Sequence, residues 1–158
     1  MIVQSIYHSP IGDIEISGHE KGIVSMFWID DFKGRNEIHP LLLDCYQQLD
    51  EYFNGIRKAF DIELDLQGSD FQKGVWSRLR QIPYGETITY LELAQSLGDK
   101  KKIRAVGRAN GENPFNIIVP CHRVIGSDGS LVGYGGGLWR KQWLLEFERA
   151  AFQTRMFH

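Results

Sequence analysis

Apolar and polar residues alternate with a period of two near the start of the chain. Residues 2–7, 13–17 and 23–29 each carry this alternation, and the turn-prone sequence GHEKG lies between the last two. A period of two places every second side chain on the same face of a strand. The pattern therefore predicts two or three strands, which include a hairpin.

A helical period replaces the alternation between residues 39 and 56. Pro40 suits the first turn of a helix, and Gly55 lies where this helix is expected to end. Because Cys45 falls on the apolar stripe of the helix, we interpret it as a small core side chain. Residues 59–66 alternate again and predict one more strand. The helical stripe consists of Leu42, Cys45, Leu49, Tyr52, Phe53 and Ile56.

Helical periodicity returns in the second half of the chain, over residues 70–82, 90–97 and 100–110. Thr89 and Glu92 stand in the order of a capping box before the second of these helices. A tight connection joins the last two helices, which is typical of a helix-turn-helix, whose second helix normally enters a DNA groove. The first helix is predicted to bury Phe71, Val75, Trp76, Leu79 and Ile82.

The predicted helix over residues 100–110 has one basic side. The run from Lys100 to Arg108 contains no acidic residue, whereas an ordinary solvated helix face mixes acids with bases. This composition favours contact with the phosphates or a groove of a nucleic acid. A helical wheel places Ile103, Val106 and Asn110 on the inner side, and Lys101, Arg104, Ala105 and Arg108 on the outer side.

The last part of the chain predicts a short buried strand, a cysteine segment, a glycine loop and a final helix. Residues 116–119 have the apolar composition of a buried strand. The glycine loop, residues 133–137, lacks the lysine and hydroxyl of a P-loop, so we interpret it as a closely packed pocket wall. In the final helix, Glu148 falls where it can point back toward the cysteine. That helix is predicted to bury Leu138, Trp143, Leu144 and Phe147.

Composition and charge narrow the class of protein. The 158 residues are 42% hydrophobic and 24% charged, which is typical of a folded globular protein. Since the sequence contains no bilayer-length apolar run and no signal-peptide pattern, we expect a cytoplasmic protein without a membrane partner. Residues 1–69 hold 5 Lys and Arg against 12 Asp and Glu, and residues 70–158 hold 13 against 8. The second half thus has a net positive charge, which suits a polyanionic partner.

Cys121 lies in the sequence NIIVPCHRVIG, directly before His122 and Arg123. A cysteine acts as a nucleophile only as the thiolate, and basic neighbours lower its pKa. In an extended segment His122 would point away from Cys121, so contact requires a turn or a bridging water. The other histidines show no metal-ligand spacing, which argues against a metal site. These residues alone leave a hydrolase, a redox sensor, an alkyl acceptor and a structural cysteine open.

The motifs taken together resemble those of a known family. The run NPFNIIVPCHRVIGSDGSLVGYGGGLWRKQWLLEFE is similar to the O6-alkylguanine-DNA alkyltransferases, also called methylated-DNA-protein-cysteine methyltransferases. The segments FQKGVWSRLRQIPYGETITYLELA, IRAVGRANGENP and SPIGDIEISGHEKGI resemble the preceding parts of that family. The resemblance implies an α/β (α+β) protein. Residues 1–68 would form a mainly structural, ribonuclease-H-like α/β domain, and residues 69–158 a mostly helical, winged helix-turn-helix-like DNA-binding and catalytic domain.

The resemblance also implies a role for each site residue. Cys121 would accept the alkyl group from O6-alkylguanine, with O4-alkylthymine as a second candidate substrate. His122, through a water, and Glu148 would activate the thiol, and Asn113 would brace the turn around the site. Residues that would contact the DNA or the extruded base are Tyr90, which helps rotate the nucleotide, Arg104, which fills its gap, Ala105, Arg108, Arg123, Tyr134 and Gly135.

Several further expectations follow from the resemblance. The reaction would be stoichiometric, without cofactor, and the partner would be the minor groove of double-stranded DNA, bound by a monomer that flips the target base. Some members hold a structural zinc, but this chain has no cysteine before Cys45 and has His19 where a ligand could lie, so we expect no metal. Arg108 is bulkier than the small residue expected there. The alternatives are a non-catalytic lesion-binding protein of the same fold, a helix-turn-helix regulator and a cysteine hydrolase.

Overall fold

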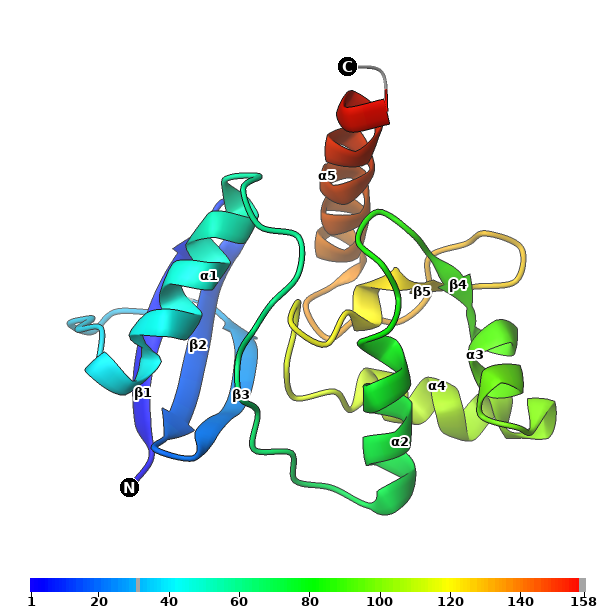
Figure 1. Cartoon of the computed structure of the whole chain (residues 1–158), viewed down its shortest axis with the longest axis horizontal. Helices are drawn as coiled ribbons and strands as arrows, with labels where there is room; N and C mark the ends of the chain where they lie inside the picture. The colour runs from blue at the N-terminus through cyan, green and yellow to red at the C-terminus, as the bar shows by residue number, and fades with distance from the viewer. Residues whose placement is uncertain (31, 157–158) are drawn as a thin grey trace. The chain divides into compact units, whose positions relative to one another are not determined.

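The computed structural model describes residues 1–30 and 32–156, and the side chains of that part as far as Arg149. The chain divides into two compact units, Met1–Gln67 and Gly68–His158 (Figure 1). Each unit is described by itself below. No helix within the described ranges is long and apolar enough to cross a membrane.

The first unit is an antiparallel three-stranded sheet with one helix. Strands β1 (Val3–Ser9), β2 (Gly12–His19) and β3 (Gly22–Ile29) pair in sequence order. A 3₁₀ turn, η1 (Pro40–Leu42), leads into helix α1 (Leu43–Phe53). The predicted strands, hairpin and helix are therefore confirmed.

The core of this unit lies between α1 and the sheet. Ile14, Ile16 and Met26 of the sheet are fully buried, and the Cys45 sulfur of α1 lies 3.8 Å from that of Met26. Burial raises the pKa of the Cys45 thiol to about 12, so this cysteine stays protonated, as expected of a core side chain. Ile56 was predicted to be buried but is 74% exposed, because α1 ends before it.

The predicted strand over residues 59–66 is wrong. Only one parallel bridge forms, between Ile23 and Leu64. The Gln48 side chain accepts a hydrogen bond from the Asp61 backbone N–H at 2.9 Å and donates one to its carbonyl at 2.9 Å. Because a side chain on α1 satisfies these backbone groups, the segment needs no strand partner there.

The second unit is mostly helical. It contains α2 (Asp70–Leu79), β4 (Ile88–Thr89), α3 (Tyr90–Ser96), η2 (Lys100–Lys102), α4 (Ile103–Gly111), η3 (Cys121–Arg123), β5 (Val124–Ile125) and α5 (Leu138–Met156). The two short strands pair in parallel, with Ile88 opposite Val124. Helices α3 and α4 form the predicted helix-turn-helix (Figure 1).

Capping and packing hold the helices of this unit in place. Both Ser69 and Thr89 head capping boxes, before α2 and α3. The Trp76 indole N–H of α2 donates to the carbonyl of Ala109 in α4 at 2.9 Å. The buried groups of α2 and α4 are thus tied together, which fixes the α4 helix relative to the rest of its unit.

Three predictions of burial or strand structure in this unit need correction. Residues 116–119 are buried, but they form a turn instead of a strand. Leu138 is 48% exposed because it is the first residue of α5, before that helix reaches the core. Phe71, in the first turn of α2, is 37% exposed, and the Lys102 ammonium lies 5.6 Å from its ring centroid.

Replacing Ser69 by Ala is expected to destabilise α2. The change removes the side-chain acceptor for the Gln72 N–H, and a lost cap of this kind costs about 1 kcal/mol. Amide hydrogen exchange of the α2 residues measures this loss. Ser77→Ala, at an exposed position inside the same helix, is the control and should change the exchange free energy by less than about 0.5 kcal/mol. Equal protection in both variants would contradict the role of the cap.

Candidate active site

Cys121 lies in a tight 3₁₀ turn. Its backbone N–H donates to the Val119 carbonyl at 2.8 Å, and the Arg123 N–H donates to the Pro120 carbonyl at 3.0 Å. The turn replaces the extended geometry in which neighbouring side chains point to opposite sides. Cys121 is only 5% exposed and His122 is fully buried.

The Asn113 side chain holds the turn that precedes Cys121. Its amide donates to the Val119 carbonyl at 2.7 Å and the Phe115 carbonyl at 3.3 Å, and its oxygen accepts from the Phe115 N–H at 2.9 Å. Ile117 within this turn has φ 74°, in the left-handed region that β-branched residues rarely adopt. Such a backbone persists only where surrounding bonds fix it, and Asn113 supplies three of them. These bonds also explain why residues 116–119 are not a strand.

His122, Arg123 and Glu148 form a buried network. The His122 Nε2 lies 2.8 Å from Glu148 Oε2, and the Arg123 Nε and Nη2 donate to the two oxygens of the same carboxylate at 2.8 and 2.9 Å. An ionised carboxylate only accepts hydrogen bonds, so Nε2 carries the imidazole proton. Within the described residues the other nitrogen, Nδ1, is buried and has no protein hydrogen-bond partner. Nδ1 is therefore the nitrogen that can accept a proton.

Burial and charge set the protonation of this network. Burial raises the pKa of Glu148, but His122 and Arg123 outweigh burial and hold that pKa far below its ordinary value. Burial lowers the pKa of His122, and the charges of Arg123 and Lys141 lower it further, against the opposing pull of Glu148. The pair is thus a carboxylate beside a neutral imidazole.

Lys141 is a site residue that the sequence reasoning missed. Its side chain is fully buried, and its ammonium donates to the carbonyls of Val132 at 2.9 Å and Gly133 at 3.3 Å. Burial lowers its pKa to about 8, and a charge on Cys121 opposes that shift. A signal was present, because Lys141 stands seven residues, or two helical turns, before Glu148 on α5.

The Cys121 thiol experiences opposing influences. Burial raises its pKa, whereas a hydrogen bond from the Asn113 side chain, the Lys141 charge and a backbone hydrogen bond lower it. The net direction is upward, so the resting residue is a thiol. A proton acceptor is then needed for nucleophilic attack, and His122 is the adjacent imidazole.

A pocket lies between α4 and the loop before α5. Its volume is about 440 Å³, and it is lined by Tyr90, Ile103, Arg104, Gly107, Val132 and Gly133. The Tyr90 hydroxyl donates to the Val132 carbonyl at 3.0 Å and accepts from the Asn110 amide at 3.4 Å. The Asn110 amide also lies 3.5 Å from the Cys121 carbonyl. These bonds bring Tyr90 beside the cysteine segment. Tyr134 and Gly135, the expected pocket wall, follow the lining residues in sequence but are not among them.

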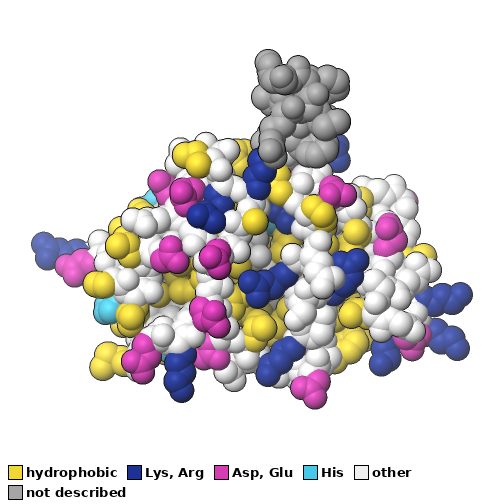
Figure 2. All heavy atoms as spheres, viewed as in Figure 1, with side chains coloured by type: hydrophobic (Ala, Val, Ile, Leu, Met, Phe, Trp, Pro, Cys, Tyr) yellow, Lys and Arg dark blue, Asp and Glu magenta, His cyan; other side chains and the backbone are white. Residues whose placement is uncertain are grey.

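The outer side of α4 agrees with the helical wheel. Lys101, Arg104, Ala105 and Arg108 are exposed, whereas Val106 and Asn110 are buried. Figure 2 shows a group of Lys and Arg side chains projecting at the edge of the molecule where the α3–α4 connection lies in Figure 1. The helix-turn-helix therefore presents positive charge to solvent.

The assignment of Arg123 to DNA contact is wrong. Arg123 is 6% exposed, and besides Glu148 its guanidinium donates to the Ile82 carbonyl at 2.7 Å. Three of its N–H donors are directed at protein acceptors inside the unit, and its burial leaves little of the guanidinium accessible to a phosphate. The sequence did not reveal the burial of Arg123, because hydrophobic periodicity does not predict the turn in which it lies.

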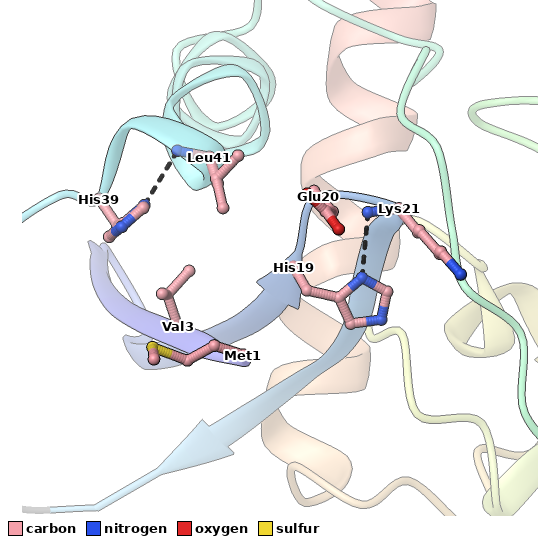
Figure 3. A pocket seen from close by; sticks show the side chains of 7 residues that line it. All are labelled: Met1, Val3, His19, Glu20, Lys21, His39 and Leu41. Atoms are coloured by element: carbon pink, nitrogen blue, oxygen red, sulfur yellow. Dashed lines mark hydrogen bonds between the residues drawn. The ribbon is translucent and has the colours of Figure 1, made fainter.

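A second pocket, of about 450 Å³, lies in the first unit (Figure 3). Its histidines stabilise turns: His39 Nδ1 accepts from the Leu41 N–H at 3.1 Å, and His19 Nδ1 accepts from the Lys21 N–H at 3.0 Å. The other nitrogen of His19 lies 2.8 Å from Asp65. Across the described residues, no group of three His, Cys, Asp or Glu side chains is arranged to hold a metal ion.

Comparison with known protein families shows which family the chain belongs to. The profile described as 6-O-methylguanine DNA methyltransferase, DNA binding domain, matches residues 70–150, and that of the ribonuclease-like domain matches residues 2–66. The chain belongs to the 6-O-methylguanine DNA methyltransferase family. The resemblance found from the motifs is thereby confirmed, as is the mixed fold class with a ribonuclease-like first part.

Individual members of the methyltransferase family are similar over nearly their whole length. A methylated-DNA–protein-cysteine methyltransferase of Methanosarcina barkeri is 47% identical over 152 residues, covering 90% of this chain and 94% of that protein. One from Mycolicibacterium paratuberculosis is 47% identical over 154 residues, covering 94% and 93%.

Solved structures agree with the sequence comparison. The crystal structure of Mycobacterium tuberculosis O6-methylguanine methyltransferase is 43% identical, with a TM-score of 0.87 over 96% of this chain and 94% of that chain. The M. tuberculosis OGT in complex with DNA is 45% identical, with a TM-score of 0.84 over 92% of each chain.

Replacing Lys141 by Met is expected to make Cys121 less reactive at pH 7. The ammonium lowers the pKa of the Cys121 thiol, so its removal raises that pKa and decreases the thiolate fraction. The rate of carbamidomethylation by iodoacetamide, followed by the mass of the Cys121 peptide, measures the effect. The difference should shrink above about pH 8, where Lys141 itself loses its proton.

Lys73→Met is the control for this experiment, since it removes one lysine charge from α2. It should leave the Cys121 rate unchanged. A wild-type rate in Lys141→Met at pH 7, or an equal decrease in Lys73→Met, would contradict a specific effect of Lys141 on the thiol.

Proposed function

We propose that the protein repairs DNA by direct reversal, transferring the alkyl group of O6-alkylguanine irreversibly to its own Cys121. The observation that carries the proposal is the buried Cys121 turn beside a neutral His122 that is bonded to Glu148. Membership of the 6-O-methylguanine DNA methyltransferase family and the names of its relatives support the same reaction. The presence of Cys121 speaks against a non-catalytic lesion binder.

The reaction is a one-step displacement at the alkyl carbon. His122 Nδ1 takes the Cys121 proton through a bridging water, and Glu148 stabilises the imidazolium that forms. The sulfur then forms a bond to the carbon while the bond from that carbon to guanine O6 breaks. The electron pair of the broken bond stays on the guanine, and the proton that His122 took from Cys121 returns through water to the guanine, which is restored. A thioether remains on Cys121, so each molecule reacts once.

The target base has to leave the helix before it can react. A sulfur atom cannot approach the group on O6 in line while the base is stacked, so the nucleotide is extruded into the pocket beside Tyr90. Arg104, exposed on α4 and lining that pocket, fills the gap in the stack. The small Ala105 permits close approach of α4 to the minor groove, with Arg108 near the phosphates.

The remaining assignments follow from the same arrangement. All proposed catalytic residues lie in Gly68–His158 of one chain, which supports action as a monomer. The Met1–Gln67 unit has a mainly structural role. The acceptor thiol must stay reduced, which suits the cytoplasm. O4-alkylthymine is a second candidate substrate, because its O4-alkyl group presents the same kind of carbon.

Incubation with a duplex that contains O6-methylguanine tests the proposal. The tryptic peptide bearing Cys121 should gain the mass of one methylene, equivalent to replacing the thiol hydrogen by methyl, with one methyl per protein molecule. Cys121→Ser should gain none, and Cys45→Ser should react as wild type does because Cys45 is a core thiol. Full lesion binding without modification would favour the non-catalytic binder. If the protein neither binds the lesion nor becomes modified, the proposal is refuted.

Arg104→Ala separates extrusion from chemistry. Loss of the side chain that fills the gap should slow transfer from duplex by about tenfold, equivalent to ~1.4 kcal/mol, while reaction with free O6-benzylguanine changes little. Single-turnover rates on both substrates measure the difference. Arg57→Ala removes the same charge from the first unit and serves as control. Equal slowing on both substrates would contradict the role assigned to Arg104.

A further inference from the structure

We propose that Arg123 is a positioning residue of the alkyl transfer: its guanidinium holds the Glu148 carboxylate and keeps His122 in the neutral, Nε2-protonated form that accepts the thiol proton. The inference rests on the proposed function and deepens it by adding Arg123 to the three residues that the proposed reaction uses, Cys121, His122 and Glu148. It replaces the DNA contact first expected of Arg123.

The geometry of Arg123 is that of a fixed clamp. Two of its nitrogens donate to the two oxygens of Glu148 at 2.8 and 2.9 Å, and a third donates to the Ile82 carbonyl at 2.7 Å. A bidentate pair of this kind fixes the plane of the carboxylate as well as its position. Since His122 is bonded to the same carboxylate, the imidazole takes its orientation from a group that Arg123 holds.

The count of charges in the cluster favours a neutral His122. The negative charge of Glu148 is already matched by Arg123, and Lys141 adds a second positive charge from α5. A proton on His122 before the reaction would leave buried positive charge without a counter-charge, which is costly in a medium of low polarity. When the proton comes from Cys121, a thiolate appears at the same time and balances it.

Four charged or titratable groups of the described residues lie around this histidine. Glu148 and Lys141 project from α5, and Cys121 and Arg123 flank His122 in η3. Tyr84, in the turn after α2, has its ring centroid 5.7 Å from the Arg123 guanidinium, and burial raises its pKa to about 12, so it stays neutral. Arg123 bonds to both oxygens of the carboxylate that holds the imidazole.

Removal of Arg123 has a definite consequence for His122. Glu148 would lose the guanidinium that bonds to both of its oxygens, so its negative charge would act more strongly on His122 and draw a proton onto the imidazole. The imidazolium has no lone pair to accept the Cys121 proton. The titration midpoint of His122 should therefore rise, and alkyl transfer should slow at pH values below the new midpoint and recover above it.

Three variants and two measurements test this. The ¹⁵N shifts of the His122 imidazole, assigned with a His122→Gln sample, give its titration midpoint, and single-turnover alkyl transfer is measured from pH 5.5 to 9. Arg123→Met should raise the midpoint by about one pH unit or more, and slow transfer about tenfold for each unit at pH values below it. Arg123→Lys keeps the charge and should stay near the wild-type midpoint. Arg57→Met, which breaks an Arg–Glu pair in the first unit, should change neither.

The outcomes separate the possible roles of Arg123. A purely structural role predicts a loss of activity that is equal at every pH, with the His122 midpoint unchanged, and this result would overturn the proposal. A midpoint in Arg123→Lys as high as that in Arg123→Met would overturn it too. The imidazole titration does not depend on DNA, so absence of methyl transfer in the wild-type protein would refute the proposed function without obscuring the effect of Arg123 on His122.

A second pair of variants covers the case in which Arg123→Met does not fold, since one half of a buried ion pair is then left alone. Glu148→Gln lacks the carboxylate, and the double variant Arg123→Met, Glu148→Gln lacks both charges. Adding Arg123→Met to Glu148→Gln should raise the His122 midpoint, because only the repulsion from the guanidinium changes. Equal midpoints in these two proteins would overturn the proposal.

Discussion

The negative charge of Glu148 is the constraint on which the site depends. A carboxylate that is 1% exposed stays ionised only if cations and hydrogen-bond donors surround it. Here His122 and Arg123 bond to its two oxygens. The helix α5 brings Glu148, the turn at Cys121 brings its two partners, and the Ile82 carbonyl fixes Arg123 from a third side. The packing around one acid therefore helps to determine the position of Cys121.

Side chains that replace regular backbone pairing shape the chain at two places. Asn113 binds three backbone groups of the turn before Cys121, and Gln48 binds two of Asp61. In each case the local composition suits a strand, but a polar side chain from elsewhere satisfies the backbone first. At Asn113 the result is a left-handed Ile117 and a turn that would cost energy without those bonds.

Local patterns in the sequence predicted most of the fold and part of the site. Alternation and capping residues depend on neighbours in sequence, so β1 to β3 and the capping boxes of Ser69 and Thr89 could be read directly. The strands expected at 59–66 and 116–119 failed because their deciding bonds come from distant side chains. Arg123 was misassigned since its partner Glu148 lies 25 residues later. Lys141 was overlooked because a lysine on a helix is ordinarily solvated.

The burial of Cys121 bears on how the protein survives until it meets damage. Oxidants and small electrophiles attack the thiolate, and their access depends on exposure. The Cys121 side chain is 5% exposed and burial raises its pKa, so it offers little thiolate and little accessible surface. A protein that can react only once is thereby protected from losing its thiol to oxidation by peroxide or to alkylation by small electrophiles. The same burial that makes a proton acceptor necessary for the reaction gives the idle protein a long chemical lifetime.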